Sequence, residues 1–388
     1  MVRLGDSRTN TRNTAVGSAL PVYIDYLDRA TGVAWMTIAL PQQVDPSRPQ
    51  QQPCTLAAGS TNSSSIRWFF DTEGLPSLSL DGKRVVFPCH TSPVGSPAEV
   101  LLQDGKTLAQ LLGSGGRVDT SILFSGYTGL LGTATGLRTA VTVDGSEFWL
   151  AGISRISSGV RYLASPTSRI TRLVIGQNPQ PNGAYLPATH DVRGLALLRS
   201  VGLFVSSSAL TEPNVGRQPW GGIMLVGNRG SFPTSTQTSA TLIRGLKGLD
   251  NFQGFGFLDS NNIIALLDKG VYARVSAAMA ATELPLFAAG TAPIYRRTSL
   301  GTTVQSFTFS RAQEKWVQDE KMAAPRIPDA CYVVAITKET GPAGLSAVAY
   351  TAGRKALYRV VPATGRVTTI AVAAQGQLFR GVVLPVSF

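Results

Sequence analysis

The stretch Leu78-Ser-Leu-Asp-Gly-Lys-Arg-Val-Val-Phe87 alternates apolar and polar residues up to Asp81-Gly82 and then begins a second apolar run. Asp-Gly tolerates the positive φ angles that a tight turn needs, and an alternation with a period of two gives each strand one buried face. The stretch therefore predicts a β-hairpin with a two-residue turn. The same pattern recurs along the chain, with turn centres near residues 144, 199, 259, 311 and 352.

A hairpin repeated along the whole chain is typical of an all-β fold, and we expect a single β-propeller. Six hairpins and a further strand at 379–385, with strands at 20–40 that lack a hairpin of their own, predict seven blades. We expect 1–19 to be an extended lead-in and 20–388 to be the propeller. Pairing of the N-terminal strands with the C-terminal strand, 20–40 with 379–388, would form the closing blade and remove open sheet edges. A pair of β-sandwiches or a β-helix accounts for this spacing less well.

Composition agrees with a turn-rich all-β protein. The 388 residues are 43% hydrophobic and only 15% charged, with 40 Gly and 23 Pro. This is too apolar for a disordered chain. The formal net charge is +12, but the basic residues are spread singly, which argues against nucleic acid as a partner. A basic docking module for nucleic acid would show an affinity that falls steeply with salt.

The sequence leaves the compartment open. No segment has the roughly 18 unbroken apolar residues of a transmembrane helix, and Met1–Ser7 has no apolar core of a signal peptide. Cys54 and Cys89 could form a disulfide and leave Cys331 free, or all three could be buried thiols.

Several short motifs together resemble a known group of proteins. They are Thr72-Glu-Gly-Leu75, Ser79-Leu-Asp-Gly82, Val143-Asp-Gly-Ser-Glu-Phe-Trp149, Gly159-Val-Arg-Tyr162 and Phe379-Arg-Gly-Val382. In this respect the chain resembles secreted β-propeller-like proteins of bacteria and green algae. The resemblance covers most of the chain and implies a propeller fold and an extracellular or cell-surface location. It implies no catalytic residues.

Aligning the hairpins places polar residues at equivalent positions of the strands that would line the central channel. They are Glu73, Arg138, Arg193, Gln253, Gln305 and Arg380. A guanidinium group suits a carboxylate, phosphate or sulfate, and it is costly to bury without partners. These residues could bind an anionic ligand at the channel mouth. Alternatively, Glu73, backbone carbonyls and water satisfy the arginines, which then only hold the blades in register; we favour this second interpretation.

Other candidate sites carry less information. Glu73-Gly74 stands where lactonase-type propellers begin a metal site, but the other inner positions hold Arg and Gln, which are poor metal ligands, so we expect neither a metal nor a cofactor. His90 and His190 lack the partners of a catalytic triad. Trp220 could stack on a sugar from an exposed loop, or fill space between blades.

These observations favour a non-enzymatic, extracellular binding or scaffold propeller that contacts glycans or protein partners through its loops and channel mouth. The alternative is a hydrolase or lyase that acts on an anionic substrate. In that case Arg138, Arg193 and Arg380 would clamp the substrate, and Glu73 would be the general acid or base.

Overall fold

The computed structural model is all-β. It describes residues 1–6, 18–57, 73–97, 100–101, 105–113, 116–124, 135–154, 159–169, 171–176, 192–207, 222–237, 240–242, 251–259, 262–268, 271–275, 294–298, 302–310, 312–313, 315–318, 326–327, 331–341, 344–353 and 355–384. Helix is nearly absent from these residues, and the strands form several antiparallel sheets.

The largest sheet contains both the N-terminal strands and the last strand. Along its path lie β28 (Leu378–Gly381), β1 (Val2–Leu4), β2 (Ala19–Leu27), β4 (Thr55–Ala57), β6 (Arg84–His90), β7 (Lys106–Leu112) and β8 (Arg117–Phe124). Two further strands pair beside this path: β3 (Ala34–Ala39) pairs with β2, and β5 (Ser77–Leu78) pairs with β6.

The other sheets follow in chain order. The second has β9 (Thr135–Thr142), β10 (Phe148–Ser154), β11 (Gly159–Leu163) and β12 (Arg172–Gly176), and the third has β13 (Val192–Leu198), β14 (Gly202–Ser207), β15 (Gly222–Val226) and β16 (Ala240–Leu242). The fourth has β17 (Asn251–Asp259), β18 (Asn262–Asp268), β21 (Thr302–Ser310), β22 (Lys315–Gln318) and β23 (Arg326–Ile327). A separate pair is formed by β19 (Val271–Val275) and β20 (Ile294–Thr298), and the last sheet has β24 (Cys331–Gly341), β25 (Gly344–Gly353), β26 (Ala356–Val361) and β27 (Arg366–Val372).

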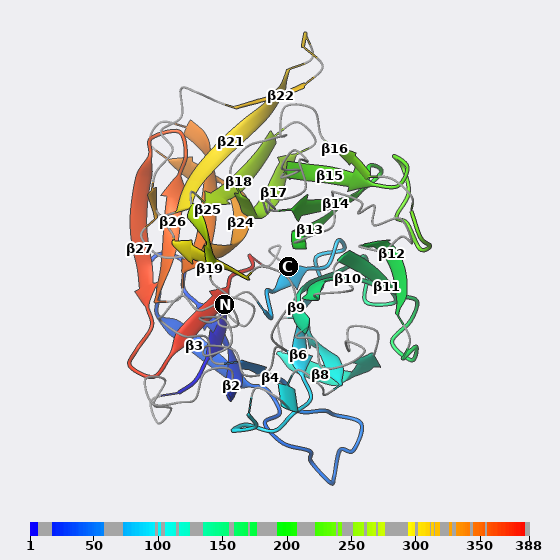
Figure 1. Ribbon diagram of the computed structural model, residues 1–388. Helices are drawn as coiled ribbons and strands as arrows, with labels where there is room; N and C mark the ends of the chain where they lie inside the picture. Colours follow the sequence, from blue (N-terminus) through cyan, green and yellow to red (C-terminus); the bar gives the residue numbers. More distant parts are fainter. Residues whose placement is uncertain are drawn as a thin grey trace.

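The sheets lie around a common centre, as Figure 1 shows. Contacts run in succession from β6 to β9, from β9 to β13, from β13 to β17, from β17 to β24 and from β24 to β28. The largest sheet consists of two four-stranded units, β28 with β1–β3 and β5–β8, joined through β4. In the described part of the chain, the strands therefore group into six units around the centre, five of four strands and one of five, with β4 and the β19–β20 pair outside them.

The expected hairpins do not each correspond to a separate sheet. The turns near residues 259 and 311 were assigned to separate blades, but β18 pairs with β21 along its whole length, from Asn262↔Thr308 to Asp268↔Thr302. Both hairpins therefore belong to one sheet. The chain inserts β19 and β20 between the two hairpins, which is why their spacing resembled that of successive blades.

The two ends of the described chain meet in the unit that contains β28. Strand β28 pairs with β1, with Arg3 opposite Phe379 and Leu4 opposite Leu378, and β1 pairs in turn with β2. A strand thus lies within the segment 1–19 that was expected to be an extended lead-in. Its side chains Val2 and Leu4 are buried, which explains why this short strand is held in the sheet.

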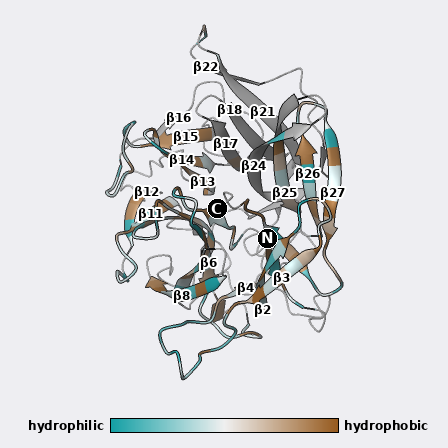
Figure 2. Ribbon diagram, turned by 180° about the vertical axis from the view of Figure 1, so that it is seen from behind, coloured by the Kyte–Doolittle hydropathy of each residue, from teal (hydrophilic) through white to brown (hydrophobic). Residues whose placement is uncertain are grey.

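The hydrophobic core lies between adjacent units. One cluster joins β6–β8 to β9–β11, the next joins β9–β12 to β13–β15, and another joins β25–β27 to β28. Trp149 on β10 is fully buried, and its indole N–H donates to the carbonyl of Pro233 at 2.7 Å. In Figure 2 most of the hydrophobic colour lies on the described strands, and the connecting loops are mainly hydrophilic.

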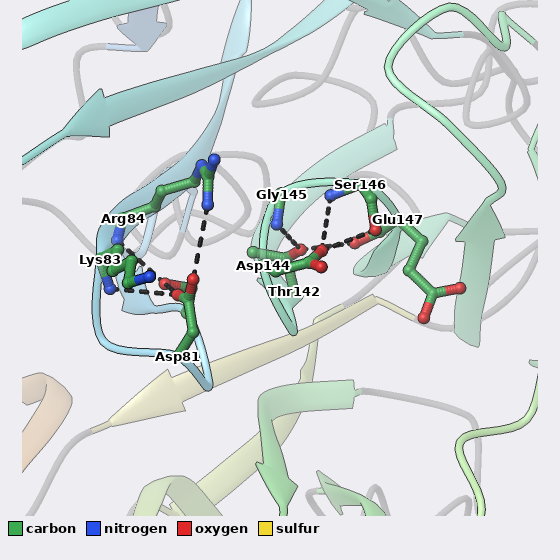
Figure 3. A network of polar contacts seen from close by, with 9 residues as sticks. Asp81, Lys83, Arg84, Thr142, Asp144, Gly145, Ser146 and Glu147 are labelled. Carbon is green, nitrogen blue, oxygen red and sulfur yellow. Dashed lines mark hydrogen bonds and ion pairs between the residues drawn. The ribbon is translucent and has the colours of Figure 1, made fainter.

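The two Asp-Gly turns lie side by side at one edge of neighbouring units (Figure 3). Both turns are longer than the expected two residues. Between β5 and β6, the amide of Ser79 donates to the carbonyl of Arg84 across the turn. Five residues separate the end of β9 from the start of β10. Gly82 and Gly145 have φ angles of 77° and 88°, the conformation that favours glycine. The amide of Asp81 donates to the carbonyl of Val143 at 2.9 Å, so the turns also connect two units.

A disulfide joins Cys54 to Cys89 on β6, with a sequence separation of 35. This bond lies beside the single pairing of β4 with β6, Thr55 with His90. We expect the double substitution Cys54→Ala, Cys89→Ala to lower the free energy of unfolding by about 2–4 kcal/mol, because the unfolded chain is no longer cross-linked. Urea unfolding with and without reductant measures this. Reductant should destabilise the wild type and leave the variant unchanged; an equal response of both would contradict the prediction.

Candidate functional site

Three of the expected channel residues are almost completely buried. Glu73 is 1% exposed, and Arg138 on β9 and Arg380 on β28 are 0% exposed. Strands β9 and β28 are the ones through which their units contact the neighbouring units. A guanidinium group in such a place is stable only when the surrounding protein provides it with polar partners.

Backbone contacts bring these three residues to the same region around β4. The segment that follows Glu73 runs beside β9, where the amide of Leu75 donates to the carbonyl of Arg138 at 2.7 Å. Arg380 donates from Nη2 to the carbonyl of Ala57 at the end of β4, at 2.8 Å. A side chain at Gly74 would collide with Leu56 on β4, so the Glu73 segment is packed directly against this strand.

The other expected residues are not brought into this group by the described structure. Arg193 lies on β13 and Gln253 on β17, but the placement of their side chains is outside the described part of the chain, as is Trp220. Gln305 lies on β21, the third strand of its sheet, rather than on the strand at the centre. Its assignment to the channel followed from counting the turn near residue 311 as a separate blade, and the pairing of β18 with β21 corrects it.

Glu73 instead belongs to a buried polar cluster with His90 and Lys106. Its Oε2 lies 2.8 Å from Nε2 of His90. On the other side of the ring, Nζ of Lys106 lies 2.9 Å from Nδ1 of His90 and 2.6 Å from the carbonyl of Leu101. His90 and Lys106 are directly opposite each other on β6 and β7, and each is 2% exposed.

Nδ1 of His90 also lies 3.0 Å from the carbonyl of Leu101, so it has both a donor and an acceptor within hydrogen-bond distance. In the tautomer that lets Nδ1 accept from the ammonium group of Lys106, which can only donate, Nε2–H donates to the carboxylate of Glu73. The imidazole is then neutral. Burial and the neighbouring charge of Lys106 lower the pKa of His90 from its ordinary value of 6.5, against the opposing effect of Glu73.

A lowered pKa for His90 makes folding depend on pH. Below pH 6.5 the unfolded chain binds a proton at this residue and the folded chain does not, so stability is lost as the pH falls. We expect the free energy of unfolding to decrease between pH 7 and pH 5 by up to about 1.4 kcal/mol per pH unit from this group. Urea unfolding at several pH values should give a smaller slope for His90→Gln than for the wild type. Equal slopes would show that His90 does not contribute.

The chemistry available to this cluster is limited by its burial. A carboxylate that orients a neutral histidine is half of a nucleophilic site. Here, however, the second ring nitrogen is occupied by Lys106, and all three side chains are at most 2% exposed. Oε1 of Glu73 accepts no hydrogen bond from the described residues. The arrangement links β6, β7 and the segment before β5, and it gives a substrate no access.

The sequence alone did not reveal the roles of His90 and Lys106. Each is a charged or titratable residue at the end of an apolar strand, which is the only local signal. Their contact depends on the register of β6 with β7, and the contact with Glu73 depends on tertiary packing.

Within the described part of the chain, no three His, Cys, Asp or Glu side chains gather in a way that could hold a metal ion. No helix among the described residues is long and apolar enough to cross a bilayer.

Comparison with known proteins gives only distant similarities. No family model and no curated protein matches the chain. Among solved structures it is similar to a candidate 6-phosphogluconolactonase from Bacteroides uniformis, with 10% identity and a TM-score of 0.40 over 96% of this chain and 97% of that one. It is similar to another from Bacteroides fragilis, with 11% identity and a TM-score of 0.39 over 95% and 93%. Drosophila Plexin A, in complex with Semaphorin 1b, shows 10% identity and a TM-score of 0.36 over 99% and 82%. Similarities at this level carry no argument about activity.

Proposed function

We propose that the chain is a closed β-propeller of six blades that acts as a non-enzymatic binding scaffold. The closed ring is supported by the succession of contacts from β6 through β9, β13, β17 and β24 to β28. It is supported further by the pairing of β28 with β1 and by the hydrogen bond from Arg380 to β4. Radial repetition of this kind leaves only short, protected sheet edges.

The observation that carries the non-enzymatic role is the burial of the charged residues at the centre. Glu73 is engaged by His90, Arg380 is engaged by the carbonyl of Ala57, and Arg138 is fully buried. These groups hold neighbouring units together and have no surface to offer to a polymer. Contacts with glycans or protein partners would then be made by the outer loops, where binding residues on rigid scaffolds usually lie.

We also place the protein outside the cell or at its surface. The support is the disulfide between Cys54 and Cys89, since such bonds persist in oxidising compartments and are rare in the cytosol. The resemblance to secreted propeller-like proteins of bacteria and green algae agrees with this location.

The proposal is tested by measuring binding and turnover on the same preparation. We expect the purified protein to bind members of a glycan array or a protein partner in a pull-down. We expect it to release neither reducing ends nor unsaturated uronate from polygalacturonate, alginate or chondroitin sulfate. Absence of any binding on both platforms would count against the scaffold role.

A hydrolase or lyase remains the second candidate, because Oε1 of the buried Glu73 accepts no hydrogen bond from the described residues. A general acid or base would need such an oxygen, together with access that a side chain 1% exposed lacks. Turnover that is present in the wild type and absent from a folded Glu73→Gln variant would establish this alternative and overturn the scaffold role.

A further inference from the structure

A cavity of about 400 Å³ lies where the β2–β3 turn, the first Asp-Gly turn and the last sheet come together. Its walls are mostly aliphatic and aromatic, and they include Ile24, Leu78, Leu111, Leu357 and Trp35. A volume of this size is typical of a site for a small molecule. Glu73, Arg138 and Arg380 do not line the cavity, so it is separate from the buried polar residues at the centre.

Three basic side chains line this cavity, namely Arg29, Lys83 and Arg84. Arg84 is partly neutralised by Asp81, at 3.6 Å. Arg29 lies 3.6 Å from Glu339, but that carboxylate is held more closely by Arg359, at 2.6 Å. Lys83 is exposed and forms no ion pair with the described residues.

The two carboxylates that line the cavity already accept hydrogen bonds from other groups of the protein. Asp25 forms a buried ion pair with Arg3 and also accepts from the hydroxyl of Thr37 at 2.8 Å. Asp28 accepts from the amide and the hydroxyl of Thr31 and from the amide of Ala30, which lowers the pKa of Asp28 below its ordinary value. Asp28 keeps its negative charge, and Arg29 is shared with Glu339, so the positive charge beside the apolar wall that no described ion pair neutralises is that of Lys83.

An exposed aromatic ring stands at the same place. Trp35 is 66% exposed although it lines the cavity, and its ring lies 5.2 Å from that of Tyr26. Val33 and Val372, on the two segments that meet at Gly32 and Ile370, are also more than half exposed. Of these exposed apolar side chains, Trp35 lines the cavity, and an exposed aromatic ring at a cavity is typical of a binding site.

We propose that this cavity binds a small amphipathic carboxylate, with its apolar body against Trp35 and the aliphatic wall and its carboxylate at Lys83 and Arg29. The apolar wall supplies most of the affinity, and the two cations select an anion over a neutral compound of the same shape. This ligand class differs from the glycan or protein partner of the outer loops, so either can be found without the other.

Isothermal titration of the full chain with dodecanoate, dodecanol and acetate tests the proposal. We expect saturable binding of one dodecanoate per chain with a dissociation constant of about 1–100 µM, and much weaker binding of dodecanol and acetate. Lys83→Gln and Arg29→Gln should each weaken dodecanoate binding by about fivefold, and Trp35→Ala by about tenfold. Arg366→Gln, an exposed arginine on β27 that does not line the cavity, is the matched control and should leave the dissociation constant unchanged.

Three outcomes would overturn the proposal. One is absence of saturable dodecanoate binding, and another is equal affinity for dodecanol. The third is that the substitutions at the cavity have no larger effect on dodecanoate affinity than the control substitution Arg366→Gln. These substitutions are Trp35→Ala, Lys83→Gln and Arg29→Gln. These substituted side chains are at least partly exposed, so the variants should fold, and a near-UV circular dichroism spectrum checks that they do.

Discussion

Replacing Glu73 by Gln is expected to lower the free energy of unfolding by about 3–5 kcal/mol. The carboxylate is 1% exposed and accepts the Nε2–H of His90, which in turn accepts from the ammonium group of Lys106. Without the negative charge, that ammonium group stays in a low-dielectric interior without its balancing anion. Urea unfolding followed by tryptophan fluorescence measures the change.

The matched control is the same substitution at a partly exposed site. Glu339 is held by Arg359 at 2.6 Å, and its side chain is 23% exposed. Because solvent screens this pair, Glu339→Gln should cost no more than about 1 kcal/mol. A Glu73→Gln variant as stable as the wild type, but unable to bind or turn over a ligand, would show that Glu73 is functional rather than structural.

Replacing Gly32 by Ala is expected to cost about 2–5 kcal/mol, because two effects combine. Gly32 has a φ angle of 70°, which is strained for any residue with a side chain. A Cβ at this position would also lie 1.9 Å from the carbonyl oxygen of Ile370 on β27. Backbone atoms cannot yield as a flexible side chain does, so either the β2–β3 turn or β27 must move.

Gly113→Ala separates the two effects. Gly113 has a similar φ of 64°, but a Cβ there would meet nothing within 4 Å. This variant should therefore show the conformational cost alone, about 1–2 kcal/mol. Thermal unfolding of both variants makes the comparison. If Gly32→Ala costs no more than Gly113→Ala, the β2–β3 turn does not pack against the last sheet as described.

Local patterns predicted the fold class because alternation and Asp-Gly turns are encoded within a few residues. The stretch around Asp81-Gly82 and its counterpart at Asp144-Gly145 do form turns between paired strands. The grouping of hairpins into sheets is a long-range property. Nothing near residues 259 and 311 indicates that β18 and β21 pair across an inserted hairpin, so the number of units could not be predicted.

For the candidate site, too, the sequence indicated individual residues but not the long-range contacts between them. Arg138, Arg380 and Glu73 stood out because aligning the hairpins placed them at equivalent inner positions, and the structure buries all three. Their partners could not be inferred, because the contact of Arg380 with Ala57 joins residues 323 positions apart. The cavity beside Trp35 could not be predicted either, since its walls come from both ends of the chain and from the turn at Gly82.

Native-state hydrogen exchange at β28 tests closure of the ring most directly. If β28 pairs with β1 and completes the circle, its hydrogen-bonded amides should exchange only through global unfolding, with the same free energy and denaturant dependence as those of β1 and β2. Fast exchange at Leu378–Gly381 that is independent of denaturant, while the core strands stay protected, would contradict the closed ring.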